Sequence, residues 1–355
     1  MYKNLDQLKK QYDSSNMFDV LLDYPNQFKK SFEIFDRYIT EYKNITDSNN
    51  FNKVIILGMG GSAIGGEIIA NILYQLNSDI EIFVNRDYTI NKNIDSKTLI
   101  IASSYSGNTE ETIEAFNLIL SKTNNIVCVT TGGKLKELAE KLKLRFITLP
   151  GGLQPRCALL YSLFVNINVI ISSKFIENNI KKEINKSIHE IREKIINWTK
   201  LYSTIDSNNT SILMAESFQS KTPVIYSTSK LSSVNLRWQG QIQENAKIPA
   251  FGNILPEMNH NEINAWDSDK FKNDFSVLIL ADQEHKRNNK RIKLLQELIN
   301  PNVNTRILEM SSKYYLTRII EFIILGDWMS YYLALLLKKD PTDIPLITEL
   351  KNKLS

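Results

Sequence analysis

Side chains that bind metals or carry redox chemistry are scarce in this chain of 355 residues, which has only two cysteines and three histidines. Cys128 and Cys157 lie in apolar surroundings, and their spacing matches neither a metal site nor a disulfide framework. We therefore expect buried free thiols in a reducing compartment. A zinc enzyme would need several clustered His, Cys or carboxylate ligands, so we predict no metal ion.

Charge of one sign is not concentrated anywhere in the sequence. The 43 Lys and Arg residues nearly balance the 39 Asp and Glu residues, which leaves a net charge of +4. Nucleic-acid-binding tails contain dense blocks of Lys and Arg, and none is present. We expect no nucleic-acid partner, whereas small anionic substrates are compatible with this balance.

The sequence also has little that indicates a membrane. Its first residues, MYKNLDQLKKQYD, are charged and lack the apolar core of a signal peptide. The most apolar long stretch, Tyr314–Leu337, contains Arg318, Glu321 and Asp327. Because charged groups are costly in a bilayer, we predict a buried helix there rather than a membrane span. A cytoplasmic protein is expected.

Short apolar strands alternate with helical patterns through most of the chain. The expected strands are VIIL at 54–57, IEIFVN at 80–85, TLIIAS at 98–103, NIVCVT at 125–130, RFITLP at 145–150, TPVIYSTS at 222–229, FSVLIL at 275–280 and TRILEM at 305–310. This alternation predicts an α/β fold in which parallel sheets carry helices on both faces. The length and the recurrence of the pattern indicate two tandem, doubly wound domains with additional N-terminal and C-terminal helices.

The domain boundaries follow from where this pattern starts and stops. We expect an N-terminal helical segment at 1–50, a first α/β domain at 51–173, a helical connector at 174–209, and a second α/β domain with the C-terminal helix at 210–355. The second domain has no copy of the glycine-rich turn of the first. Chemistry is therefore expected in the first domain and at the junction of the two.

A glycine-rich turn, GMGGSAIGG at 58–66, follows the first strand and leads into a helix. Glycine permits positive φ and a close backbone approach to a ligand. The helix N-terminus offers amides and a partial positive charge to a phosphate, so Gly60, Gly61 and Ser62 are candidate contacts. Two alternatives remain: a tight turn without a ligand, and the dinucleotide pattern G-x-G-x-x-A, whose expected acidic residue is poorly matched by Asp87.

A second turn, SSYSGNTEET at 103–112, joins the third strand to the next helix. Ser104, Ser106 and Thr109 place three hydroxyls around Gly107, which is more than helix capping requires. Hydroxyls and amides without a lysine suit a terminal phosphate monoester. They do not suit a nucleoside triphosphate, because no G-K-[ST] motif accompanies them.

These two turns resemble those of sugar isomerase (SIS) domains. Three further motifs, GLQPR at 152–156, ENAKIPAF at 244–251 and LPEMNHNEI at 255–263, resemble the bifunctional phosphoglucose/phosphomannose isomerase family, from about Phe51 to the C-terminus. The resemblance implies two SIS domains and a homodimer whose active sites lie between subunits. It also implies reversible isomerisation of glucose 6-phosphate, and of mannose 6-phosphate, with fructose 6-phosphate. This reaction belongs to glycolysis and gluconeogenesis and proceeds through a cis-enediol without a metal or cofactor.

The resemblance also assigns roles to single residues. Glu244 matches the family's proton-transfer base, although by itself it reads as an ordinary exposed helix glutamate. His260 is implied for ring opening and comes from the neighbouring subunit in that family. Arg156 would stabilise the enediolate. Lys351 matches a lysine linked to ring opening, and its neighbour Lys353 is the alternative.

Within the His260 loop, two further carboxylates, Glu257 and Glu262, flank the histidine. We expect them to orient the loop rather than to move protons.

Other functions are compatible with parts of the sequence. A non-catalytic SIS regulator would keep the phosphate turns and lose the base, so the presence of Glu244, His260 and Arg156 argues against it. A dinucleotide-dependent oxidoreductase is disfavoured by the hydroxyl-rich second turn. An amidotransferase-type aminosugar synthase would need an N-terminal domain with a nucleophilic cysteine, which we do not expect here.

Overall fold

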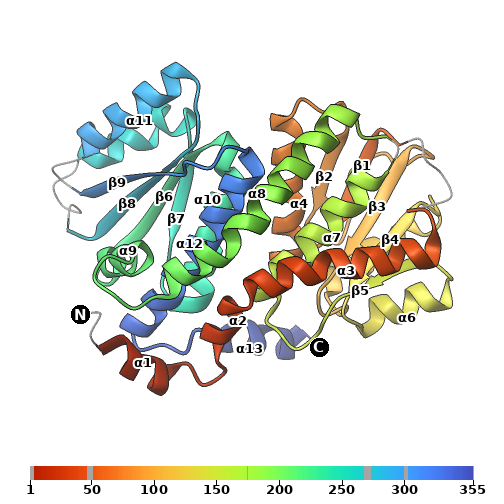
Figure 1. The fold of residues 1–355 in the computed structure, drawn as a ribbon, viewed down its shortest axis with the longest axis horizontal. Helices are drawn as coiled ribbons and strands as arrows, with labels where there is room; N and C mark the ends of the chain where they lie inside the picture. Colours follow the sequence, from red (N-terminus) through yellow and green to blue (C-terminus); the bar gives the residue numbers. More distant parts are fainter. Residues whose placement is uncertain (1–3, 46–50, 174, 268–272, 300–302, 355) are drawn as a thin grey trace. The chain divides into compact units, whose positions relative to one another are not determined.

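The computed structural model describes residues 4–45, 51–173, 175–267, 273–299 and 303–354. The chain forms two compact units (Figure 1). One unit consists of Asp23–Arg192, and the other combines Met1–Leu22 with Glu193–Ser355. The units therefore do not follow the order of the chain, because the first helices belong with the C-terminal half.

The sheet of the Asp23–Arg192 unit has the order β2-β1-β3-β4-β5, and all neighbouring strands are parallel. Its strands are β1 (Lys53–Leu57), β2 (Glu81–Asn85), β3 (Thr98–Ser103), β4 (Ile126–Thr130) and β5 (Arg145–Thr148). Its helices are α3 (Tyr24–Tyr42), α4 (Gly60–Gln75), α5 (Glu110–Ile119), α6 (Gly133–Lys141), α7 (Leu159–Ser172) and the first part of α8 (Asn178–Ser203). The predicted doubly wound parallel sheet is confirmed.

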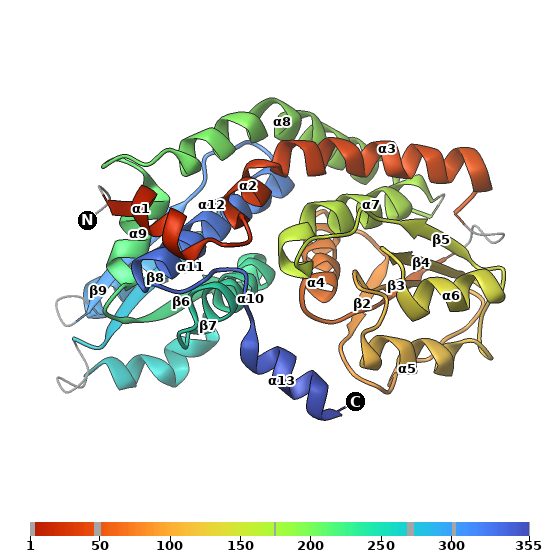
Figure 2. The ribbon, with the colours of Figure 1, turned by 90° about the horizontal axis from the view of Figure 1, so that it is seen from below.

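Helices cover both faces of this sheet, with α4 and α7 on one side and α5 and α6 on the other (Figure 2). Consecutive side chains of a strand point to opposite faces. Ile55 and Leu57 therefore pack with Phe116 of α5, whereas Ile56 lies against Gly66 of α4. Because both faces are buried, the inner strands are continuous apolar runs rather than alternating ones.

The second unit contains a four-stranded parallel sheet of order β7-β6-β8-β9. Its strands are β6 (Thr222–Thr228), β7 (Phe251–Leu255), β8 (Phe275–Ala281) and β9 (Asn304–Glu309). Its helices are α1 (Leu5–Tyr12), α2 (Met17–Leu22), the end of α8, α9 (Thr210–Phe218), α10 (Ser232–Gln241), α11 (Lys286–Ile299), α12 (Tyr315–Leu336) and α13 (Pro345–Leu354). Strand β7 was not predicted.

Two helical segments, Pro155–Ser172 and Tyr315–Leu336, are long and apolar enough to cross a membrane, but most of each segment is buried inside the protein. Such burial is typical of core helices. Two charges of α12 are paired there, Arg318 with Asp282 and Asp327 with Arg237, and Glu321 accepts hydrogen bonds from Tyr202 and Ser312. The prediction of a buried helix is confirmed.

Helices α1 and α2 pack against α12. The rings of Phe18 and Trp328 meet edge to face, with centroids 5.1 Å apart. The Tyr331 hydroxyl donates a 3.0 Å hydrogen bond to Asp13 Oδ2. These contacts explain why the first 22 residues belong to the C-terminal unit.

Both cysteines are buried, and neither forms a disulfide. Burial raises the pKa of the Cys128 thiol to about 12. This thiol therefore stays protonated and unreactive near neutral pH.

Candidate active site

The two candidate phosphate turns follow adjacent strands. β1 and β3 are parallel neighbours, with Leu57 opposite Ala102. From β1 the chain leads first to β2, which is one neighbour of β1 in the sheet, and then to β3, which is its other neighbour. The carboxyl ends of β1 and β3 therefore form the switch point at which doubly wound sheets bind ligands.

At the first turn, α4 begins at Gly60, and its N-cap residue Met59 makes no side-chain capping bond. The first amides of a helix have no intrahelical partner, which leaves this end suited to an anion. Gly60 has a φ of +49°, and a side chain there would meet nothing within 4 Å, so the turn is open at this point. Ser62 is buried in the same helical turn.

The segment that carries Arg156 lies directly against this turn. It forms a short 3-10 helix, Pro155–Ala158. A Cβ placed on Gly61 would lie 2.9 Å from the Pro155 carbonyl oxygen and 3.5 Å from Arg156 Cα. Only glycine permits this approach. The arginine itself is 3% exposed, so a permanent positive charge is buried beside the candidate phosphate site.

Tyr105 connects the second turn to the loop before Arg156. Its hydroxyl donates to the Pro150 carbonyl at 2.7 Å and accepts from the Leu153 amide at 3.3 Å. Both turns and the Arg156 segment therefore meet at one edge of this sheet.

The three hydroxyls of the second turn differ in their surroundings. Ser104 is 1% exposed, and its Oγ accepts from the Gly107 amide at 3.1 Å and lies 2.9 Å from Thr109 Oγ1. Ser106 is exposed, and its Oγ accepts from the Asn108 amide at 3.3 Å. Ser104 thus shapes the turn, whereas Ser106 and Thr109 are accessible to a ligand.

The turn between β4 and α6 packs against the second phosphate turn. Gly107 has a φ of +70°, and a Cβ there would lie 1.8 Å from the Gly132 carbonyl oxygen. Asn108 Oδ1 accepts from the Lys134 amide at 3.0 Å. The shape of the second turn therefore depends on a glycine at position 107.

The second sheet carries carboxyl groups where the first carries its hydroxyl-rich turn. After β8, the counterpart of β3, Asp282 pairs with the guanidinium of Arg318. Nearby, Thr228 at the end of β6 donates to Glu284 Oε1. Burial raises the pKa of Glu284, although the Thr228 hydrogen bond and the Lys230 charge act in the opposite direction. Ionised carboxyl groups accept hydrogen bonds and donate none, so these positions lack the hydroxyl donors that the first sheet offers to a phosphate.

Glu244 lies directly after α10, where the backbone hydrogen bonding changes from the α-helical to the π-helical pattern. Residues Ile242–Ala246 form a π-helical turn, and Lys247 follows in the left-handed conformation, with a φ of +58°. The Glu244 residue is half-buried. Isolated π-helical turns within helices occur frequently at functional sites, and this one was not predicted.

His260 ends a 3-10 helix, Glu257–His260, and is exposed. In the part of the chain that the structure describes, no hydrogen bond or ion pair involves its ring. Glu262 accepts from the Tyr226 hydroxyl and, at 2.6 Å, from Asn253 Nδ2, which fixes the loop to β6 and β7. These contacts are those expected of a residue that orients the loop.

The two lysines of α13 differ. Lys353 Nζ lies 2.6 Å from Glu349 Oε1 in an exposed pair. Lys351 is also exposed, and within the described ranges no ion pair involves it. No residue of α13 is buried. Lys351 thus remains accessible, whereas Lys353 is engaged on its own helix.

The predicted site residues fall into two groups. Gly60, Gly61, Ser62, Ser104, Ser106, Thr109 and Arg156 belong to the Asp23–Arg192 unit, and Glu244, His260 and Lys351 belong to the other unit. Among the described residues, no group of three or more His, Cys, Asp or Glu side chains could hold a metal ion.

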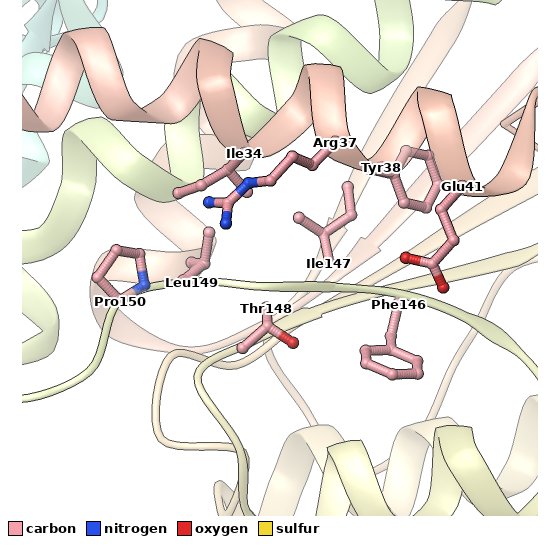
Figure 3. Close-up of a pocket in the computed structure, with 9 residues that line it drawn as sticks. All are labelled: Ile34, Arg37, Tyr38, Glu41, Phe146, Ile147, Thr148, Leu149 and Pro150. Carbon is pink, nitrogen blue, oxygen red and sulfur yellow. The ribbon is translucent and has the colours of Figure 1, made fainter.

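A cavity of about 410 Å³ lies elsewhere in the Asp23–Arg192 unit, between α3 and the edge strand β5 (Figure 3). Its lining is mixed, with Arg37 and Glu41 on the helix side and Thr148 on the strand side among apolar residues. None of the predicted site residues lines it.

The two sheets and their turns define a protein with two SIS domains. A SIS domain model matches residues 49–165, and a model described as the bacterial phospho-glucose isomerase C-terminal SIS domain matches residues 207–354. The structure of tagatose-6-phosphate ketose/aldose isomerase from Escherichia coli is similar in fold, with a TM-score of 0.63 at 14% identity, covering 94% of this chain and 96% of that one.

Relatives in sequence define the family more closely. A bifunctional phosphoglucose/phosphomannose isomerase from Caldicellulosiruptor bescii is 38% identical over 349 residues, which cover 96% of this chain and 99% of the relative. A D-glucosamine-6-phosphate 4-epimerase from Sulfolobus acidocaldarius is 31% identical over 73% of this chain and 78% of the relative. This chain belongs to the bifunctional phosphoglucose/phosphomannose isomerase family, which confirms the resemblance predicted from its motifs.

Proposed function

We propose that this enzyme reversibly isomerises glucose 6-phosphate, and mannose 6-phosphate, with fructose 6-phosphate by a metal-free cis-enediol mechanism. One observation carries the proposal: two phosphate-type turns and the buried Arg156 segment lie together at one edge of the first sheet. It occurs in a chain that matches a bifunctional isomerase over almost its full length.

The substrate phosphate binds at the two turns. Amides at the start of α4 and α5 supply hydrogen-bond donors and the positive end of each helix dipole. The hydroxyls of Ser62, Ser106 and Thr109 complete the contacts, together with the backbone of Gly60 and Gly61. Ser104 supports the turn from within, because its Oγ accepts from the Gly107 amide and lies 2.9 Å from Thr109 Oγ1.

Proton transfer occurs at C1 and C2 of the open-chain sugar. Glu244 removes the C2 proton of the aldose, which gives the enediolate, and returns it to C1 while the O2 proton passes to O1. The guanidinium of Arg156 stabilises the negative charge that develops on these oxygens. Return of the proton to either face of C2, after rotation about the C2–C3 bond, gives glucose 6-phosphate or mannose 6-phosphate.

Ring opening is assigned to His260 and Lys351. The exposure of His260, and its lack of a bond within the described part of this chain, are compatible with a histidine that serves a second copy. We therefore propose a cytoplasmic homodimer in which each active site receives His260 from the partner. Lys351 is proposed because it matches the family's lysine, and Lys353, which shares an exposed pair with Glu349, is the alternative.

A coupled assay on the EDTA-treated protein tests this function. Fructose 6-phosphate is supplied, and the formation of glucose 6-phosphate and of mannose 6-phosphate is followed separately. We expect both products at rates that EDTA does not lower. Binding of fructose 6-phosphate without any product would contradict the proposal and favour a non-catalytic SIS regulator.

Removing two hydroxyls of the second turn should weaken substrate binding. The Ser106→Ala/Thr109→Ala variant loses two hydrogen bonds to a charged phosphate, each worth about 1.5–3 kcal/mol. We expect KM to rise at least tenfold and kcat to change much less. Thr123→Ala is the control, because its hydroxyl accepts from the Asn125 amide at the start of β4. An unchanged KM in the double variant would place the phosphate elsewhere.

A further inference from the structure

A row of buried polar side chains joins the segment that carries Glu244 to helix α12. Arg237 Nη2 donates to Asp327 Oδ2 at 2.6 Å, and Gln241 Nε2 donates to Asp327 Oδ1 at 2.7 Å. Asn245 Nδ2 donates to Ser330 Oγ at 2.9 Å. The Ser330 hydroxyl donates in turn to the Asp327 carbonyl at 2.9 Å.

All five side chains are buried, and none is more than 4% exposed. Burying charges and amides costs free energy, which well-placed partners offset only in part. Apolar residues could join two helices without that cost. The polar row therefore does something that apolar packing does not, which is to fix one register and one rotation of α10 against α12.

The spacing of the row explains the π-helical turn. Three members of the row lie on α10 and the turn that follows it, and they are spaced four residues apart: Arg237, Gln241 and Asn245. An α-helix turns about 100° per residue, so two such steps would carry position 245 about 80° away from position 237. A π-helical turn closes i→i+5 hydrogen bonds and rotates less per residue. The turn at Ile242–Ala246 thus brings Asn245 back to the face that contacts α12.

A second contact between the same helices is independent of this row. Trp238 Nε1 donates to the Phe322 carbonyl at 3.0 Å. A Cβ on Gly326 would lie 2.4 Å from that indole nitrogen, so the helices approach closely here. This contact lies next to the Arg237–Asp327 pair, six residues before Glu244, and involves neither Asn245 nor Ser330.

We propose that Asn245, Ser330 and Asp327 are positioning residues for the proton-transfer base. Asn245 is the immediate neighbour of Glu244 and lies in the same π-helical turn. Its bond to Ser330, together with the bond of Gln241 to the Asp327 carboxylate, sets the rotation of that turn and hence the direction of the Glu244 carboxylate. This inference rests on the proposed role of Glu244.

Two variants test the proposal in the full-length enzyme, with fructose 6-phosphate as substrate. Asn245→Ala and Ser330→Ala should each lower kcat about 10- to 100-fold while KM changes less than about threefold, because the phosphate turns are untouched. Ser330→Ala removes only one hydroxyl from a helix, which keeps the test valid if Asn245→Ala does not fold.

Trp238→Phe is the matched control, since it removes a buried hydrogen bond between the same helices. We expect it to lower the melting temperature at least as much as Ser330→Ala and to change kcat less than threefold. If Trp238→Phe lowers kcat as much as Ser330→Ala does, or if Ser330→Ala leaves kcat unchanged, the positioning role is wrong. Glu244→Gln, measured in parallel, separates the two claims: full turnover in that variant would overturn the base assignment itself.

Discussion

Glu244→Gln is expected to lower kcat about 10²–10⁴-fold, the usual contribution of a positioned general base. Glutamine keeps the shape of the side chain but cannot accept the C2 proton. Because Glu244 does not contact the phosphate in this account, KM for fructose 6-phosphate should stay within about threefold. Steady-state kinetics in both directions, together with a thermal melt to confirm folding, measure these values.

Glu257→Gln is the appropriate control for this substitution. Glu257 is an exposed glutamate near His260, and it carries the same charge without a role in proton transfer. We expect its kcat to remain within about threefold of the unsubstituted enzyme. Turnover that survives Glu244→Gln but falls with Glu257→Gln would move the base to the His260 loop.

Gly107→Ala is expected to weaken substrate binding strongly. An alanine would hold an unfavourable φ of +70°, and its Cβ would lie 1.8 Å from the Gly132 carbonyl oxygen. The left-handed conformation alone costs about 1–2 kcal/mol for a residue other than glycine. The turn must therefore move, and we expect KM to rise at least about 100-fold, as measured by initial rates over a wide range of fructose 6-phosphate.

Gly132→Ala provides the comparison, because a Cβ on Gly132 would meet nothing within 4 Å. Its KM should remain near that of the unsubstituted enzyme. Equal effects of the two substitutions would mean that the shape of the second turn does not control substrate binding.

The inner strands β1, β3 and β4 were predicted and are buried on both faces, and the partly buried strands β2, β5 and β9 were predicted as well. Apolar runs such as Val54–Leu57 can only belong to the middle of a covered sheet. Strand β7, FGNIL, is different, because glycine and asparagine are rare in strands. Gly252 is there because a Cβ would lie 2.4 Å from the Ile225 carbonyl and 2.5 Å from Asn235 Oδ1. That requirement arises from a neighbouring strand and helix, so a local pattern does not reveal it.

The packing of the first helices could not be predicted for a similar reason. The bond between Asp13 and Tyr331 joins residues 318 positions apart. Periodicity identifies an amphipathic helix but not the surface that it covers.

The parts of the candidate site that consist of short local motifs could be predicted from the sequence. Glycines and hydroxyls at two strand ends indicated the phosphate turns, but the motif alone did not distinguish Ser104 from Ser106. Only the fold separates them, since one is buried beneath the turn and the other is exposed. The π-helical turn at Glu244 was missed because its partners, Asp327 and Ser330, lie about 85 residues away along the chain.

The most direct test of the enediol mechanism is isotope exchange in deuterium oxide. Glucose 6-phosphate would be incubated with the EDTA-treated enzyme until equilibrium with fructose 6-phosphate is reached, and C1 and C2 would be examined by NMR. A glutamate that exchanges its proton with solvent between turnovers predicts deuterium at C2 of the aldoses and at C1 of the ketose, and Glu244→Gln should slow its appearance in step with kcat. Many turnovers without any deuterium at either carbon would contradict proton transfer through Glu244.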